Sequence, residues 1–240
     1  MKRFNKNEFL WFLILFFFTV YIYYLISTGK IFLFIHPKLI VYTSFSFVIF
    51  GTLTVFQFFN IFKVKTRAKM KNGFLLFAFA LVTAVFIAPG GLTPDIINQK
   101  GVILVSSNNI ENIGKHTHSK EEIIIGNTIE FNAKNYIHYL EELSSNIEKH
   151  KGKKVKISGF AYKEENLNKN EFMLFRILIN CCAADSQVFG IMCNWDKAEV
   201  LEKDSWVNVE GILKVKDNRP FILVKKLERA EKPVNTYIYE

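Results

Sequence analysis

Three long uncharged runs dominate the N-terminal half of the chain. They cover residues 9–27, 39–62 and 73–89, and each is rich in Phe, Leu, Ile or Val. At about 1.5 Å of rise per residue, the first run covers roughly 28 Å, close to the thickness of the hydrocarbon core of a bilayer. Because an unsatisfied backbone amide is costly in hydrocarbon, each run is expected to be helical. The pattern predicts three transmembrane helices within a transmembrane domain over residues 1–92.

Smaller features refine this expectation. The first run is longer than the apolar stretch of a signal peptide, and no small-residue cleavage site follows it, so we expect it to be retained. The apolar segment 31–35 is too short to span a bilayer and is expected to lie in the interface or to fold back against the helices.

Gln57 and Asn60 interrupt the second run near its end. We expect them to hydrogen-bond a neighbouring helix or a second subunit.

The pattern changes after the third run. Residues 93–125 are expected to form a polar linker, and residues 126–240 a separate β-domain outside the membrane. Apolar residues recur at three- and four-residue spacing between residues 133 and 150, which predicts a helix. Five strand-like runs follow this helix. They are residues 154–162, 171–179, 187–194, 206–215 and 220–227.

Glycines and connection lengths indicate how these five strands are arranged. Gly159 and Gly211 interrupt two of the runs, as expected where a sheet bends sharply. The connection over residues 195–204 is longer than the others and has room for one helical turn. The predicted fold is a C-terminal all-β, small closed barrel of the oligonucleotide/oligosaccharide-binding (OB) type, preceded by one helix. An open sheet covered by the helix is the alternative.

The charge distribution separates the two halves. The formal net charge of +9 lies entirely in residues 1–100, where 11 basic residues face only two acidic ones. Residues 101–240 carry 20 basic and 20 acidic residues, and are therefore neutral. A barrel that binds nucleic acid would carry the basic excess itself, so nucleic acid is not an expected partner.

The same charges predict an orientation in the membrane. Three basic residues precede the first run, and five more lie between residues 63 and 71. The loop between the first two runs holds only Lys30 and Lys38. The positive-inside rule places the N-terminus in the cytoplasm. We therefore expect a multi-pass protein of the cell membrane, surrounded by the lipid bilayer, whose C-terminal domain is extracytoplasmic.

All three cysteines lie in the predicted barrel. Cys181 and Cys182 are adjacent in the turn sequence NCCAAD, whereas Cys193 lies in the third strand. Adjacent Cα atoms are about 3.8 Å apart, below the roughly 4.4–6.8 Å of ordinary disulfides, so a bridge within the pair would be strained. If the strands pair tightly up to the turn, Cys193 lies opposite Leu174, far from the pair. We therefore expect no structural disulfide.

Three interpretations of Cys181, Cys182 and Asp185 remain open. They could bind a divalent metal such as zinc, with a fourth ligand from water, a linker histidine or a partner protein. The adjacent thiols could cycle through a strained disulfide as a redox site, although no CxxC motif is present. Alternatively, one cysteine packs as a small hydrophobic residue and the aspartate caps the turn.

Other candidates are weaker. His116 and His118 alternate in the linker beside two glutamates, and with Cys193 they are additional metal candidates. The sequence contains no HExxH, GxxxxGK[ST] or GxSxG motif, so no common catalytic framework supports an enzyme.

Six segments carry a family resemblance. They are GKKVKISGFAY, FRILINCCAAD, SWVNVEG and PVNTYIY in the C-terminal half, and TGKIFLFIHP and GLTPDIINQKG in the N-terminal half. Together they resemble the YcgQ-like family of bacterial membrane proteins. Members of that family are described as subunits of a two-component membrane permease complex. The resemblance implies a companion membrane permease subunit as partner. It also singles out Cys181, Cys182 and Asp185, with Arg176 behind them, without showing what they bind.

These observations predict a non-enzymatic accessory subunit of a membrane permease complex. Its extracytoplasmic β-domain would present the Cys-Cys-x-x-Asp turn to a metal ion or another solute. An extracytoplasmic thiol oxidoreductase is one alternative, and a structural membrane-surface module without a ligand is the other.

Overall fold

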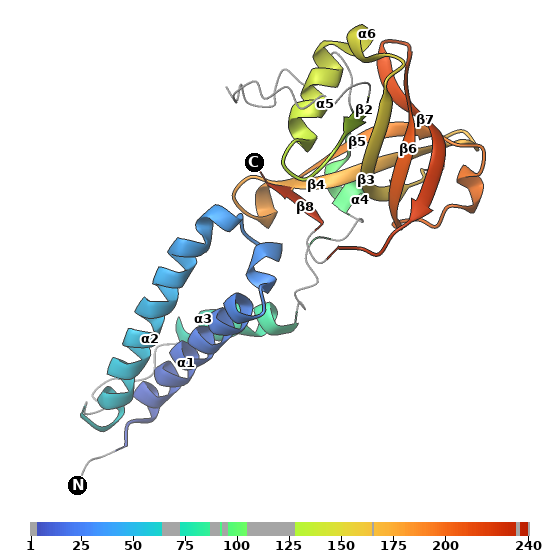
Figure 1. The fold of residues 1–240 in the computed structure, drawn as a ribbon. Helices are drawn as coiled ribbons and strands as arrows, with labels where there is room; N and C mark the ends of the chain where they lie inside the picture. Colours follow the sequence, from blue (N-terminus) through green and yellow to red (C-terminus); the bar gives the residue numbers. More distant parts are fainter. Residues whose placement is uncertain are drawn as a thin grey trace. The chain divides into compact units, whose positions relative to one another are not determined.

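The chain folds into two compact units. The computed structural model describes residues 4–63, 73–86, 92, 96–104, 128–164, 166–233 and 236–239. One unit comprises Met1–Gly91 together with Cys181–Ala183, and the other comprises Leu92–Asn180 and Ala184–Glu240. Figure 1 shows the first as a group of helices and the second as a β-barrel with short helices.

Two antiparallel helices, α1 (Lys6–Ser27) and α2 (Ile40–Lys63), form the centre of the first unit. The side chain of Asn5 caps α1 by accepting hydrogen bonds from the amides of the first turn. The Asn5 amide donates to the Ile61 carbonyl at 3.1 Å, so the start of α1 lies beside the end of α2. Further along, the Thr19 and Thr54 hydroxyls hydrogen-bond at 3.1 Å.

A polar contact joins the two helices near one end. The Gln57 amide donates to a carboxylate oxygen of Glu8 at 2.6 Å and to its backbone oxygen at 3.1 Å. The expected bond from Gln57 to a neighbouring helix is thereby confirmed. Among the described residues, no side-chain hydrogen bond from Asn60 to another helix is seen.

Two helices are long and apolar enough to cross a membrane, namely Lys6–Ser27 and Pro37–Lys63. The third helix, α3 (Gly73–Phe86), is described over 14 residues, or about 21 Å, which is shorter than a bilayer core. Residues 87–89 of the predicted span lie outside the described residues. The third transmembrane span therefore stays a prediction.

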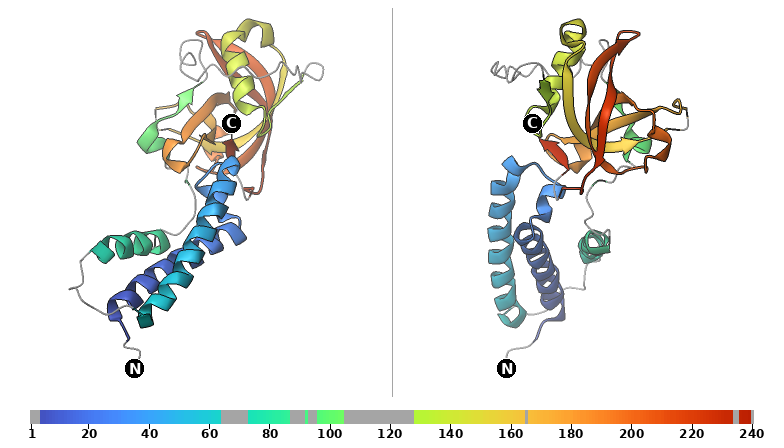
Figure 2. Two further views of the ribbon diagram at one scale, coloured as in Figure 1. Left: turned by 90° about the vertical axis from the view of Figure 1, so that its left-hand side faces the viewer. Right: turned by 45° about the vertical axis from the view of Figure 1, so that its right-hand side comes forward.

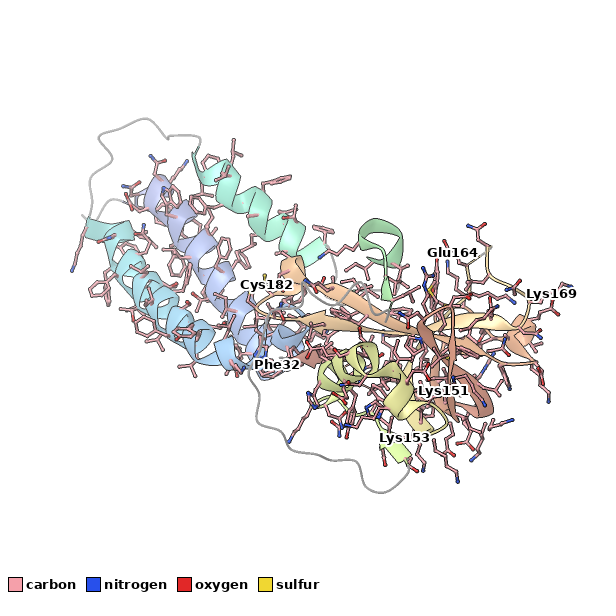
Figure 3. All side chains as sticks on the ribbon, turned by 90° about the horizontal axis from the view of Figure 1, so that it is seen from above. Phe32, Lys151, Lys153, Glu164, Lys169 and Cys182 are labelled. Atoms are coloured by element: carbon pink, nitrogen blue, oxygen red, sulfur yellow. The ribbon has the colours of Figure 1, made fainter. Side chains whose placement is uncertain are left out.

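Large apolar side chains cover the outer faces of these helices, and Figure 3 shows that most atoms projecting from them are carbon. The exposed residues include Tyr42, Phe45, Phe56 and Phe59 on α2, and Leu76, Phe79 and Phe86 on α3. Monomeric soluble proteins rarely expose so large an apolar surface. Lipid or a partner protein is therefore needed to cover it.

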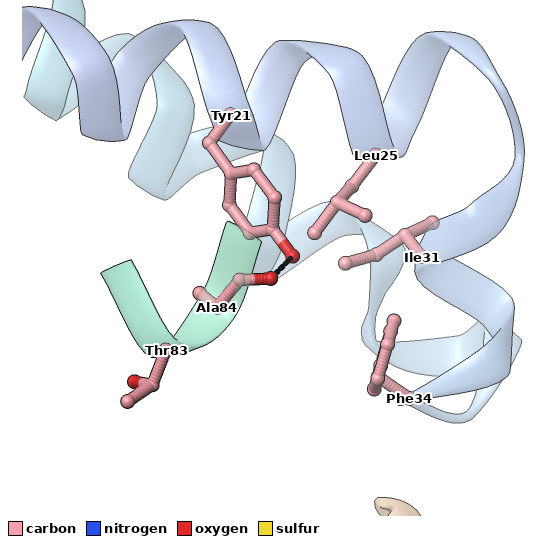
Figure 4. Close-up of a pocket in the computed structure, with 6 residues that line it drawn as sticks. All are labelled: Tyr21, Leu25, Ile31, Phe34, Thr83 and Ala84. Atoms are coloured by element: carbon pink, nitrogen blue, oxygen red, sulfur yellow. Dashed lines mark hydrogen bonds between the residues drawn. The ribbon is translucent and has the colours of Figure 1, made fainter. Parts of the chain in front are cut away.

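The short segment between α1 and α2 folds back against the helices, which was one of the two positions expected for residues 31–35. It contains two 3₁₀ turns, η1 (Lys30–Leu33) and η2 (Pro37–Leu39). Ile31 is buried, and it lines a cavity together with Leu25 of α1 (Figure 4).

Five strands close into a barrel in the second unit, as the sequence predicts (Figures 1 and 2). They are β3 (Lys154–Tyr162), β4 (Glu171–Ile179), β5 (Gln187–Asn194), β6 (Trp206–Lys216) and β7 (Arg219–Arg229). The circuit runs β3–β4–β5–β7–β6 and returns to β3. The β5–β7 pair is parallel and the other four are antiparallel, so the barrel is mixed.

Three short strands that the sequence pattern does not predict extend the sheet. β1 (Ile103–Leu104) pairs with β5, β2 (Thr128–Glu130) with β3, and β8 (Tyr237–Tyr239) with β4. All three pairings are parallel. Segments of two or three residues are too short to show the alternation by which strands are recognised.

The helices of this unit also differ from the expected single helix. The predicted segment 133–150 forms α5 (Tyr136–Ser145) and α6 (Ile147–His150), with Asn146 in a non-helical conformation between them. A further short helix, α4 (Ile96–Lys100), precedes β1. The connection before β6 contains the expected helical turn, η4 (Ala198–Val200). The predicted five-stranded β-barrel is therefore confirmed, whereas several short helices accompany it in place of the single predicted helix.

The hydrophobic core lies inside the barrel and beneath α5. Tyr136, Leu140 and Leu143 of α5 are almost completely buried and pack with the inward side chains of the strands. Figure 2 shows α5 lying against the barrel. Burial of this one face explains the three- and four-residue spacing in the sequence.

The two predicted glycine bends are places where backbones approach closely. A Cβ atom at Gly159 would lie 2.6 Å from the Phe175 carbonyl oxygen. At Gly211 it would lie 2.5 Å from both the Leu223 carbonyl oxygen and the Ile222 side chain, next to a β-bulge. Neither position has room for a larger residue.

Gly211→Ala is expected to lower the free energy of unfolding by about 1–3 kcal/mol, because the new methyl group meets a backbone oxygen that cannot move freely. Chemical unfolding of the full chain, followed by circular dichroism, measures this change. Lys214→Ala, at an exposed position of the same strand, is the matched control and should change stability by less than about 0.5 kcal/mol. Equal stability of the two variants would contradict the close approach.

Candidate functional site

The connection between β4 and β5 carries the candidate residues. The last pair of the β4–β5 ladder is Leu178 with Gln187, and the chain between them includes the 3₁₀ turn η3 (Ala183–Asp185). Cys193 consequently pairs with Phe172 rather than with Leu174. The predicted register is wrong by two residues because the 3₁₀ turn needs a longer connection than a tight hairpin.

Cys181, Cys182 and Asp185 converge on this connection. Their potential ligand atoms all lie within 4.8 Å of one another. The two Sγ atoms are 3.7 Å apart, and all three cysteines are thiols rather than disulfides. Cys181 is exposed and the other two residues are half-buried, so a solute can reach the cluster. Figure 3 labels Cys182 at this connection.

The distance between the two sulfur atoms of the cluster fits a tetrahedral metal centre. Two thiolates, each about 2.3 Å from a tetrahedral zinc ion, lie roughly 3.8 Å apart. The observed Sγ–Sγ distance of 3.7 Å is close to that value. The three side chains could supply three of the four ligands that zinc prefers, which would leave one position for water or another donor.

Lys100 holds the same connection, although sequence reasoning did not select it. Its ammonium donates to the carbonyl oxygens of Ala184 at 2.9 Å and Ser186 at 2.8 Å, and to the Ser186 hydroxyl at 3.0 Å. Lys100 is 84 residues from Ala184 in sequence. The sequence signal that could have singled out Lys100 is the segment GLTPDIINQKG, which is part of the family resemblance and in which Lys100 is the only basic residue.

A second backbone segment contacts the cysteines within the first unit. The His36 amide donates to the Cys181 carbonyl at 2.9 Å, and the Ala183 amide donates to the Phe34 carbonyl at 2.8 Å. Ile35 and Cys182 form an isolated antiparallel bridge between these two bonds. The segment TGKIFLFIHP, which the family resemblance also includes, therefore contacts the CCAAD segment directly.

Arg176 has a different environment from the one that its sequence position suggests. It lies in β4, is only 7% exposed, and donates to the Thr236 carbonyl at 3.2 Å. Its guanidinium also lies over the rings of Tyr136 and Trp206. Burial lowers the pKa of Arg176, and the negative charge that Tyr136 would carry when ionised opposes this shift. Among the described residues, Arg176 therefore contacts the C-terminal segment and α5, and no contact with the cysteine pair is seen.

The remaining candidates do not join the cluster. Cys193 is 1% exposed in the barrel core, and burial raises the pKa of its thiol well above the usual range. Its environment is that of a packed hydrophobic residue. His116 and His118 lie outside the described residues.

Two cavities lie away from the cluster. One, of about 350 Å³, is lined by apolar side chains of α1, η1 and α3, and the Tyr21 hydroxyl donates to the Ala84 carbonyl at 2.9 Å beside it (Figure 4). The other, of about 380 Å³, is lined by residues of α4, β1, β3 and β4, and by Glu164. Among the described residues that line these two cavities, none is a cysteine or a histidine.

Thiol reactivity should follow these environments. A water-soluble maleimide is expected to modify Cys181 first and Cys182 second, and to modify Cys193 only after denaturation, because burial keeps that thiol protonated and inaccessible. Mass spectrometry of the labelled full chain gives the order. Cys193→Ala should remove only the modification seen after denaturation. Rapid labelling of Cys193 in the native protein, even at pH 9, would contradict its position in the core.

Comparisons with known proteins also divide the chain into two segments. Residues 10–103 match the DUF1980 N-terminal domain, and residues 107–240 match the DUF1980 C-terminal domain. The "UPF0703 protein YcgQ" of Bacillus subtilis (strain 168) is 31% identical over 94 residues, covering 37% of this chain and 33% of the relative. The "Putative two-component membrane permease complex subunit" of Streptococcus mutans serotype c (strain ATCC 700610 / UA159) is 26% identical over 117 residues, covering 46% of this chain and 42% of the relative.

Each aligned region therefore spans less than half of the relative's length. The family matches, in contrast, cover almost the whole chain in two adjoining segments. The chain belongs to the DUF1980 family.

Proposed function

We propose that this protein is a non-enzymatic accessory subunit of a membrane permease complex, and that its β-domain presents the Cys181–Asp185 turn to a divalent, thiophilic metal ion. The observation that carries the proposal is the convergence of two thiols and a carboxylate within 4.8 Å on an accessible turn. Thiolate ligands favour soft and borderline ions such as zinc over magnesium or calcium.

The apolar helices support a role beside a membrane partner. Two of them have the length and composition of membrane spans, and large apolar side chains cover their outer faces. The Streptococcus mutans relative is named as a permease complex subunit, and this name supports the same class of partner. A permease subunit that packs against these faces would cover part of that surface and leave the rest to lipid.

The incomplete ligand set supports reversible binding rather than a structural metal. Structural zinc sites are usually closed by four protein ligands, whereas three ligands leave a position through which an ion can be exchanged. Because thiolates bind metal only after deprotonation, binding should weaken as the pH falls. The site would therefore collect an ion or hand it on.

The basic residues support an extracytoplasmic position for this domain. Eight lysines and arginines belong to the N-terminus and to the segment between α2 and α3, whereas the segment between α1 and α2 has two. With three spans, the positive-inside rule places the β-domain on the side opposite to the eight charges.

Metal stoichiometry tests the proposed ligand set. The full chain, purified in detergent, is expected to bind about one zinc ion per molecule, and Cys181→Ser with Cys182→Ser should abolish this binding because both sulfur ligands are lost. Cys193→Ala is the matched control and should bind as the wild type does. The proposal would be contradicted if the wild type bound no zinc, or if the double variant bound as much zinc as the wild type.

Labelling of intact cells tests the orientation. A membrane-impermeant maleimide should modify the wild-type chain without lysis, because Cys181 is exposed and predicted to face outward. The double serine variant should remain unlabelled, since Cys193 is buried. With metal removed by a chelator beforehand, labelling that requires lysis would place the domain in the cytoplasm.

The Sγ–Sγ distance of 3.7 Å also favours a second candidate, a thiol oxidoreductase. The dithiol would reduce a disulfide substrate to two thiols while forming a strained disulfide between Cys181 and Cys182. Reduction of one equivalent of a disulfide substrate by the metal-free protein, and repeated turnover when a dithiol reductant is added, distinguish this activity from metal binding.

A further inference from the structure

The ammonium of Lys100 makes three hydrogen bonds to one short segment. Its acceptors are the Ala184 carbonyl, the Ser186 carbonyl and the Ser186 hydroxyl, at 2.8–3.0 Å. A lysine ammonium has three donors, so all of them are used here. Ser186 is 2% exposed, so the far end of the side chain reaches a buried polar group.

The backbone that carries Lys100 is itself anchored. Ile96 and Ile97 of α4 are buried, and Gly101 ends the helix in a left-handed conformation with φ of 71°. The Gly101 amide donates to the Ile97 carbonyl at 2.8 Å, and the following strand β1 pairs with β5. Figure 2 shows α4 beside the barrel. The Lys100 side chain is itself exposed, but its three hydrogen bonds connect two segments that are each held in place.

The two carbonyl oxygens belong to the residues on either side of Asp185. Their directions depend on the backbone dihedral angles around Asp185, which also set the direction in which its carboxylate leaves the chain. Holding both oxygens therefore restricts the position of the Asp185 Cβ atom, from which the carboxylate reaches toward the thiols of Cys181 and Cys182. The ammonium also adds a positive charge near a ligand set that carries three negative charges when ionised.

We propose that Lys100 is a positioning residue of the metal site, which holds Asp185 where it completes the set of three ligands. This inference rests on the proposed metal-binding function. The charge balance agrees with a divalent ion, because two thiolates, one carboxylate, one ammonium and one divalent ion sum to zero. Residues that orient metal ligands typically change metal affinity ten- to hundredfold when they are replaced.

Cobalt(II) binding to the full chain in detergent tests this role. Lys100→Met should weaken cobalt affinity ten- to hundredfold, because the side chain keeps its length but loses its donors and charge. Lys100→Arg, which retains donors and charge, should recover part of the loss. Lys197→Met, at an exposed position outside the turn, is the matched control and should bind as the wild type does.

A double-variant cycle separates positioning from general damage to the domain. If Lys100 acts through Asp185, adding Lys100→Met to Asp185→Asn should weaken binding by less than about twofold beyond Asp185→Asn alone. The visible spectrum of bound cobalt should also shift in the same direction in Lys100→Met and in Asp185→Asn, because both disturb the same oxygen ligand.

The possible results are distinguishable. Equal cobalt affinity of the wild type and Lys100→Met, or fully additive losses in the cycle, would overturn the role of Lys100 and leave the metal site intact. A wild-type chain that binds neither cobalt nor zinc would overturn the proposed function, and the role of Lys100 with it. Weaker binding by Lys100→Met with a non-additive cycle supports both.

Discussion

The pairing of β4 with β5 is the interaction on which the candidate site depends. The ladder runs from Glu171–Asn194 to Leu178–Gln187, and β5 then pairs in parallel with β7 to close the barrel. Closure fixes β5 from both sides, so the connection that enters it has a defined position. A shift in this register would change the length of the connection and separate the cysteines from Asp185.

Cysteine side chains occupy two different environments in this protein, and their chemistry differs accordingly. Cys193 is enclosed by the barrel core, where the thiolate is strongly disfavoured and the side chain packs as a small apolar group. Cys181 lies at the surface beside a second thiol and a carboxylate, where an ion can reach it. The proposed metal role therefore rests on the position of the cysteine pair, not on the cysteine count.

Long, regular patterns in the sequence predicted much of the fold. The five barrel strands lie within two residues of the predicted runs, and Gln57 makes the helix–helix bond expected of it. These features depend on side-chain periodicity and on the high cost of unsatisfied polar groups, both of which are local properties. The three short parallel strands depend on tertiary pairing, and they left no periodicity to detect.

The candidate site was predicted only in part, for a related reason. Cys181, Cys182 and Asp185 are close in sequence, so their convergence on one turn could be anticipated. The bonds from Lys100 join residues that are 84 or more positions apart, and single-sequence patterns carry no information on such pairs. Arg176 looked like part of the same motif, but strand geometry directs it to Thr236 and the aromatic rings of the core.

The central claim is that both adjacent thiols bind the same metal ion. X-ray absorption spectroscopy of the zinc-loaded full chain measures this most directly, because it reports the elements around the metal and their distances. Two sulfur neighbours at about 2.3 Å are expected, together with oxygen or nitrogen neighbours at about 2.0–2.2 Å. A first shell of oxygen and nitrogen alone would contradict it.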